Sequence, residues 1–152
     1  MNELQRIDAF NTGEVPEKTK ILITVTDVNN PSTVLQKTKD VIKPIASRGF
    51  TKKWPSDNEW KKILPAWFVE SMVKKTPADR DKDPNLWHFE SWLESMKNRA
   101  WVWWSSKIED NTITIALETL NLPYVFEQVL YIFYSQGIPM KNITTWDDVY
   151  SG

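Results

Sequence analysis

Two β-rich runs separated by three polar residues constrain the fold of this chain more than any other feature. The runs are 100–108 (AWVWWSSKI) and 112–120 (TITIALETL), and between them lie Glu109, Asp110 and Asn111. Runs of β-branched and aromatic residues around a short polar loop predict an antiparallel hairpin. The sequence therefore indicates a β-sheet against which the helical segments must pack.

Two further segments read as strands. Residues 20–28 (KILITVTDV) predict an interior strand with Ile21, Ile23 and Val25 on one face and Leu22 on the other. Residues 141–146 (KNITTW) predict a short edge strand.

Apolar residues at helical spacing predict the remaining elements. Pro44 is expected to end or kink the first helix near Ile42, and Pro65 to kink the second. Ser56 and Glu59 have the S-x-x-E spacing of a capping box at the start of the second helix. The expected helices begin at Pro31, after Ser56, at Pro84 with Asp83 as cap, and at Pro123, the last one closing with Gly137.

The order of these elements is β-α-(α-α)-β-β-α-β. It predicts an α+β fold with a ferredoxin-like βαββαβ plan and a two-helix insertion before the central antiparallel hairpin. A chain of 152 residues is close to the usual size of one domain, so we expect residues 1–152 to form a single α+β domain. Residues 1–18 contain no expected element, which leaves open a flexible N-terminal segment.

Charge and cysteine content limit the classes of partner and the compartment. Nineteen basic and twenty acidic residues give a net charge of -1, which argues against a large electrostatic nucleic-acid footprint. The absence of cysteine excludes disulfides and thiolate metal sites, and fits a reducing, cytoplasmic compartment. The longest apolar stretch, 124–134, contains Glu127 and Gln128 and is too short for a membrane helix, so no membrane association is expected.

The residues that most enzymes need are scarce. His88 is the only histidine, so a two-histidine metal site within one chain is impossible and a catalytic triad could be built only around it. The four glycines lie far apart and form no phosphate-binding loop. We therefore expect no catalytic residue, no metal and no cofactor, and we interpret His88 as a packed or surface residue.

Tryptophan is unusually frequent, with nine residues in the chain. On a strand, Trp101 and Trp103 share one face while Val102 and Trp104 share the other, so both faces carry large apolar area. We expect these residues in the core, with the second face lying under the inserted helices. Those helices would close it with four more tryptophans: Trp60, Trp67, Trp87 and Trp92. Trp87 lies off the apolar stripe of its helix and is a candidate for an exposed binding residue.

The block 100–138, a Trp-rich strand, a polar hairpin, a second strand and a Pro-started helix closing with Gly137, resembles a family. It is similar to small bacterial immunity proteins of polymorphic-toxin and contact-dependent inhibition systems. The resemblance implies a non-enzymatic cytoplasmic protein that binds one cognate toxin domain and blocks its active site. It assigns no individual functional residue.

The leading hypothesis is therefore an immunity or antitoxin-like inhibitor whose partner is a cognate toxin protein. Because the part of the chain after Ala100 is acidic, the expected interface is acidic. Its candidate residues are Glu109, Asp110, Asp147 and Asp148, with the loop acids Asp79, Asp81 and Asp83 as a second choice and Trp87 as an aromatic contact. The oligomeric state is left open.

A nucleic-acid-binding module is the alternative hypothesis. It would use a sheet with exposed aromatic residues, as RNA-recognition domains do, together with lysine pairs beside tryptophans. These pairs are Lys52-Lys53, Lys61-Lys62 and Lys74-Lys75, near Trp54, Trp60 and Trp67. A third hypothesis is an enzyme that uses His88 or a pair of carboxylates.

Overall fold

The computed structural model describes residues 2–9, 12–17, 19–48, 53–74, 88–120 and 125–147. Its helices are α1 (Glu3–Asp8), α2 (Pro31–Arg48), α3 (Asp57–Ile63), α4 (Ala66–Val73), α6 (Phe89–Lys97), α7 (Glu127–Tyr134) and the short 3₁₀ helix η1 (Met140–Asn142). Its strands are β1 (Lys20–Val25), β2 (Trp101–Glu109), β3 (Thr112–Thr119) and β4 (Ile143–Asp147).

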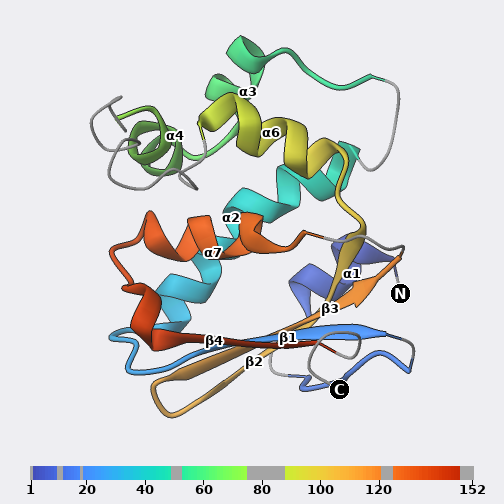
Figure 1. Ribbon diagram of the computed structural model, residues 1–152, viewed down its shortest axis with the longest axis vertical. Helices are drawn as coiled ribbons and strands as arrows, with labels where there is room; N and C mark the ends of the chain where they lie inside the picture. Colours follow the sequence, from blue (N-terminus) through green and yellow to red (C-terminus); the bar gives the residue numbers. More distant parts are fainter. Residues whose placement is uncertain are drawn as a thin grey trace.

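The four strands form one antiparallel sheet in the order β2-β3-β1-β4, which confirms the α+β class. β1 is an interior strand and β4 is a short edge strand, as the sequence predicts. β2 and β3 form the expected hairpin, with an irregularity in register between Trp103 and Ser105 that leaves Trp104 as an extra residue. Figure 1 shows the helices on one side of this sheet.

The side chains of the sheet alternate between a buried and a partly exposed face. The face toward the helices is fully buried and almost entirely apolar, so it forms the floor of the core. Its members are Ile21, Ile23, Val25, Trp101, Trp103, Ile113, Ile115 and Leu117.

The helices form two layers above this floor (Figure 1). α1, α2 and α7 lie next to the sheet, and α3, α4 and α6 lie beyond them. Trp60, Phe68 and Trp92 are fully buried in the outer layer. Trp92 Nε1 donates a hydrogen bond to the carbonyl of Gln128 on α7 at 3.1 Å.

The inserted helices therefore do not cover the second face of the sheet, and that expectation was wrong. Their apolar stripes pack against other helices, where Phe68 and Trp92 meet edge to face with ring centroids 4.7 Å apart. Trp60, Trp67 and Trp92, which were expected to close the sheet, are used in helix packing, and Trp87 lies outside the described residues. The second face of the sheet must therefore be closed by other parts of the chain or left open.

Some helix boundaries confirm the sequence predictions and others correct them. α6 begins at Phe89 and α7 at Glu127, later than the expected starts at Pro84 and Pro123, which lie outside the described residues. The capping box of Ser56 and Glu59 is present, as predicted. At Pro65 the expected kink is a full interruption, which separates α3 from α4. Pro44 does not end α2, which continues to Arg48. The helix persists because Val41, Ile42 and Ile45, on either side of the proline, are buried in the core.

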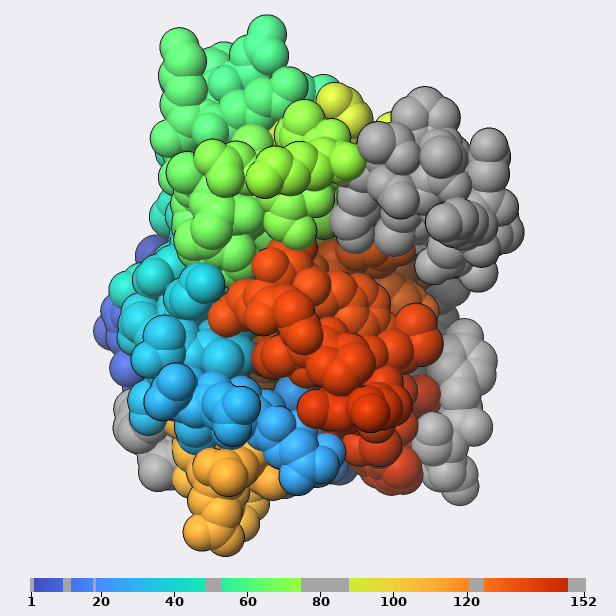
Figure 2. Space-filling view, turned by 90° about the vertical axis from the view of Figure 1, so that its left-hand side faces the viewer, coloured from blue at the N-terminus to red at the C-terminus, as the bar shows by residue number. Residues whose placement is uncertain are grey.

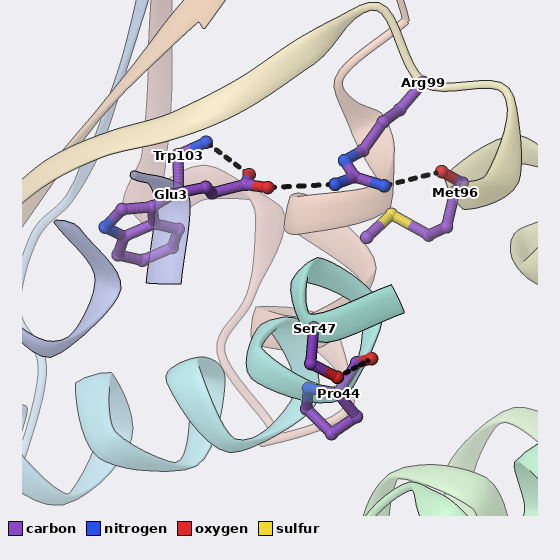
Figure 3. A network of polar contacts seen from close by, with 6 residues as sticks. All are labelled: Glu3, Pro44, Ser47, Met96, Arg99 and Trp103. Carbon is purple, nitrogen blue, oxygen red and sulfur yellow. Dashed lines mark hydrogen bonds and ion pairs between the residues drawn. The ribbon is translucent and has the colours of Figure 1, made fainter. Parts of the chain in front are cut away.

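The carbonyl of Pro44 also has side-chain partners in the last turn of α2. Ser47 Oγ donates to it at 2.8 Å (Figure 3), and Arg48 Nη1 donates to it at 3.1 Å. These bonds satisfy an acceptor near the helix end and offset part of the cost of the proline. α2 therefore reaches the outer helix layer without a break.

The N-terminal stretch contains an element that the sequence analysis did not predict. Asn2 and Gln5 form a capping box that starts α1, and Ile7 of α1 is fully buried. A six-residue helix is too short to be stable alone, so tertiary contacts must hold it.

The Glu3 side chain supplies such a contact (Figure 3). One carboxylate oxygen pairs with Arg99 Nη2 at 3.0 Å, and the other accepts the Trp103 N–H at 2.8 Å. Arg99 Nη1 also donates to the carbonyl of Met96, at the end of α6, at 3.1 Å. Burial lowers the pKa of Arg99, and the neighbouring Glu3 carboxylate opposes that shift.

Replacing Glu3 with alanine is expected to lower the free energy of unfolding by about 3–5 kcal/mol, because a buried guanidinium loses its counter-ion. Glu14→Ala is the matched control, since the ion pair of Arg6 with Glu14 is longer, at 3.4 Å, and the Glu14 side chain is 61% exposed. Its loss should be less than about 1 kcal/mol. Chemical denaturation of both variants measures the difference, and equal losses would contradict this role of Glu3.

Candidate functional site

The second face of the sheet carries no helix among the residues that the structure describes (Figure 1). Its side chains are polar or mixed, and most are partly exposed, in contrast to the dry face above. They are Lys20, Leu22, Thr24, Val102, Trp104, Ser105, Lys107, Thr112, Thr114, Ala116, Glu118, Thr144 and Trp146. This face, called the open face below, is the one broad sheet surface on which a partner could lie.

The N-terminal segment 12–17 closes the half of the open face that belongs to β2. Ser105 Oγ donates a hydrogen bond to the carbonyl of Glu14, and Pro16 is buried. Ser105 and Ala116 are each only 3% exposed although they lie on the open face. The Arg6 guanidinium of α1 lies 3.4 Å from the centroid of the Trp104 ring, a cation–π contact, and Arg6 also pairs with Glu14 of this segment.

A hollow of about 370 Å³ lies beside this segment, lined by Glu14, Val15, Glu17, Trp104 and Glu118. Its lining has three carboxylates and an indole and, among the described residues, no hydroxyl or imidazole side chain. Within the described ranges no three ligating side chains converge on a position that could hold a metal ion. Burial lowers the pKa of Lys39 and of Arg99, and neither residue lines this hollow.

The half of the open face formed by β1 and β4 is not covered by any described residue. Trp146 is 38% exposed and lies directly across the strands from Leu22, and Thr144 lies across from Thr24. The Lys20 ammonium lies 5.7 Å from the centroid of the Trp146 ring. We call these five residues the Trp146 surface. It has an apolar centre of indole and leucine with a polar rim.

The acidic residues predicted as the interface do not come together on one surface. Glu109 and Asp110 are exposed at the tip of the hairpin, which projects from one end of the molecule (Figure 2). Asp147 lies across from Ile21 at the opposite end of the sheet, on the other edge strand, and is only 7% exposed. The register of the strands therefore separates Asp147 from the hairpin acids.

The hairpin acids have local structural roles. Glu109 pairs with Lys107 at 3.5 Å, and Asp110 adopts a left-handed backbone conformation with φ of 54° in the turn. Asp148, Asp79, Asp81, Asp83 and Trp87 lie outside the described residues.

The structure also shows the positions of the tryptophans and lysines on which the other hypotheses depend. Trp101 and Trp103 are fully buried, as expected for core residues, while Trp104 is partly exposed. Lys53, Lys61, Lys62 and Lys74 are exposed, but Trp60 beside them is fully buried. Trp54 packs on Trp60 with ring centroids 4.8 Å apart, and Trp67 packs on Phe68 at 5.9 Å. His88 is an exposed residue at the start of α6.

No protein family, curated protein or solved structure matches this chain. Among the described helices, none combines the length and the apolar character needed to cross a membrane.

The sequence analysis did not single out Trp146, Leu22 or Lys20. The alternation in 20–28 places Leu22 on the face opposite the buried isoleucines. The short edge strand places Trp146 at the margin of the sheet, where a side chain can be exposed. The exposure of these residues depends on which face of the sheet the helices cover. The sequence pattern of either strand alone does not specify that face.

Fluorescence quenching tests the exposure of Trp146. Trp146→Phe should lower the fraction of emission that acrylamide quenches, because this indole is the most exposed of the described tryptophans. Trp103→Phe, at a fully buried position, is the control and should not lower that fraction, because it removes an indole that acrylamide does not reach. If both variants behave alike, the open half of the face is covered in solution.

Proposed function

We propose that this protein is a non-enzymatic binding protein that docks one partner protein on the Trp146 surface. We further propose that the partner is a cognate bacterial toxin domain, which the protein inhibits in the cytoplasm by covering its active site. The observation that carries the proposal is the exposure of the Trp146 indole next to Leu22, on a face whose other side chains are mostly polar.

The composition of the Trp146 surface supports a protein partner. Tryptophan is enriched among the residues that dominate the binding energy of interfaces, where it lies near the centre and is surrounded by polar contacts that exclude water. Leu22 extends the apolar centre, and Lys20, Thr24 and Thr144 surround it. Rigid β-strands hold all five residues, so little conformational entropy would be lost when a partner binds.

The resemblance to immunity proteins supports the choice of a toxin domain. The resembling block corresponds to the hairpin of β2 and β3 followed by α7, which packs on the same sheet. We also infer the ferredoxin-like plan for this protein. Its support is the strand order β2-β3-β1-β4, in which helices connect β1 to β2 and β3 to β4.

The distribution of charge favours protein over nucleic acid as the partner. The open face carries charges of both signs: Lys20 lies across from Glu118, and Lys107 pairs with Glu109 at 3.5 Å. Nucleic-acid binding requires a field of one sign that neutralises several phosphates. The exposed lysines of α3 are accompanied by Asp57 and Glu59 on the same helix, which weakens any such field there.

The binding experiment uses the toxin domain encoded by the neighbouring gene and calorimetric titration with this protein. Trp146→Ala should weaken binding by at least about thirtyfold, the effect of removing a central interface residue worth about 2 kcal/mol. It should also abolish protection of cells that express the toxin. Val73→Ala, at an exposed apolar residue on α4, is the control and should bind like the unmodified protein.

Two results would contradict the proposal in separate ways. Unchanged affinity of Trp146→Ala would show that the partner docks elsewhere. Failure of the unmodified protein to bind or neutralise the toxin would remove the inhibitor role. Binding of single-stranded oligonucleotides that weakens steeply with added salt would favour the nucleic-acid alternative.

A further inference from the structure

The two edges of the sheet differ in how their backbone groups are satisfied. On β2 the N–H of Trp103 points away from β3 and donates to the Glu3 carboxylate. The irregularity at Trp104 and the segment 12–17 further disrupt and cover this edge. Bulges, charged side chains and covering segments are the usual means by which proteins prevent a sheet edge from pairing with another chain.

Among the described residues, the β4 edge has none of these protections between Ile143 and Trp146. These four residues carry no charge and include no proline, and Thr144, Thr145 and Trp146 are all exposed. Thr144 and Trp146 lie on the open face, and Thr145 lies on the face toward the helices. β4 is therefore exposed on both faces of the sheet.

The register shows which backbone groups of β4 point outward. The N–H of Thr26 donates to the carbonyl of Asn142, and in an antiparallel ladder such bonded pairs recur at every second residue. Thr144 and Trp146 therefore bond to Thr24 and Leu22 on β1, while the N–H and carbonyl of Thr145 point away from the sheet. Within the described chain, no residue makes a hydrogen bond to these Thr145 groups.

We propose that β4 pairs with β4 of a second copy of this chain, antiparallel and about a two-fold axis at Thr145. The Thr145 residues of the two copies then exchange two N–H to carbonyl hydrogen bonds. Among the possible two-fold registers, this one overlaps all five residues of the strand. A strand that pairs with itself in this way forms an isologous interface, the kind found in most homodimers.

The side chains of β4 are compatible with this register. Trp146 of one copy lies across from Thr144 of the other, and the pair occurs twice by symmetry. Pairs of an aromatic with a β-branched residue stabilise antiparallel strands. Asp147 lies across from Ile143 of the second copy, so the two carboxylates are at opposite ends of the ladder and do not repel each other directly.

This inference is independent of the proposed function. Pairing of the two β4 strands would join two four-stranded sheets into one of eight strands. The two Trp146 surfaces would lie side by side on the same open face. A partner protein could therefore dock on the dimer with one binding site per copy.

Sedimentation velocity over a range of protein concentrations tests the dimer. The unmodified protein should show a concentration-dependent dimer. Thr145→Pro should weaken dimerisation by at least about tenfold, because it removes an outward N–H from each copy but no bond to β1. Thr145→Val is the matched control, which keeps the N–H and the β-branched shape and should remain dimeric.

A second variant covers the case in which proline disturbs the fold. Thr145→Lys keeps the backbone N–H and places two positive charges opposite each other, so it should also lose the dimer while circular dichroism stays unchanged. A monomeric unmodified protein throughout the concentration range would overturn the proposal. So would a dimer that persists in both folded variants. Neither result bears on toxin binding, which the Trp146→Ala titration measures separately.

Discussion

The carboxylate of Glu3 is the interaction on which the arrangement of this sheet depends. Its two oxygens connect α1 to the buried Arg99 guanidinium at the end of α6 and to the backbone of β2. The chain beyond α1 then reaches the open face, where segment 12–17 covers the β2 half. A single, partly buried acid thus joins the N-terminus, the outer helix layer and an edge strand.

This interaction makes the two edges of the sheet different. The proposed functions use the edge that it leaves open. The edge at β2 is closed by charge, irregular register and a covering segment, so it is unsuited to pairing. The opposite edge keeps an uncharged strand, and next to it Trp146 stays exposed beside Leu22. Partner docking is therefore assigned to the side chains of the Trp146 surface on β1 and β4. Self-association is assigned to the outward backbone groups of β4, with Trp146 and Thr144 paired across the two copies.

Local patterns were sufficient to predict most of the elements. The β-branched runs gave the hairpin and the interior strand, and the capping box at Ser56 gave the start of α3. α1 was missed because six residues carry too little periodicity, and its stability comes from Arg99 and Trp103, which lie about a hundred residues away in the sequence. α2 does not end at Pro44, because buried neighbours outweigh the cost of a lost backbone bond.

The candidate site was harder to predict than the fold. The sequence showed that both faces of β2 carry tryptophan, but the inserted helices pack on helices, so the assignment of Trp60 and Trp92 to the second face failed. The acidic residues were grouped by their proximity in sequence and sign of charge, while strand register places Glu109 and Asp147 at opposite ends. Exposure depends on which layer covers which face, and only the tertiary structure specifies that.

Amide hydrogen exchange at Trp103 tests the central role of Glu3 most directly. Trp103 lies on an edge strand, so its amide is protected only while the Glu3 carboxylate accepts its N–H. The account predicts slow exchange of this amide in the unmodified protein and much faster exchange in Glu3→Ala, with the Ile23 amide of the central strand unchanged. Equal exchange of the Trp103 amide in both proteins would contradict it.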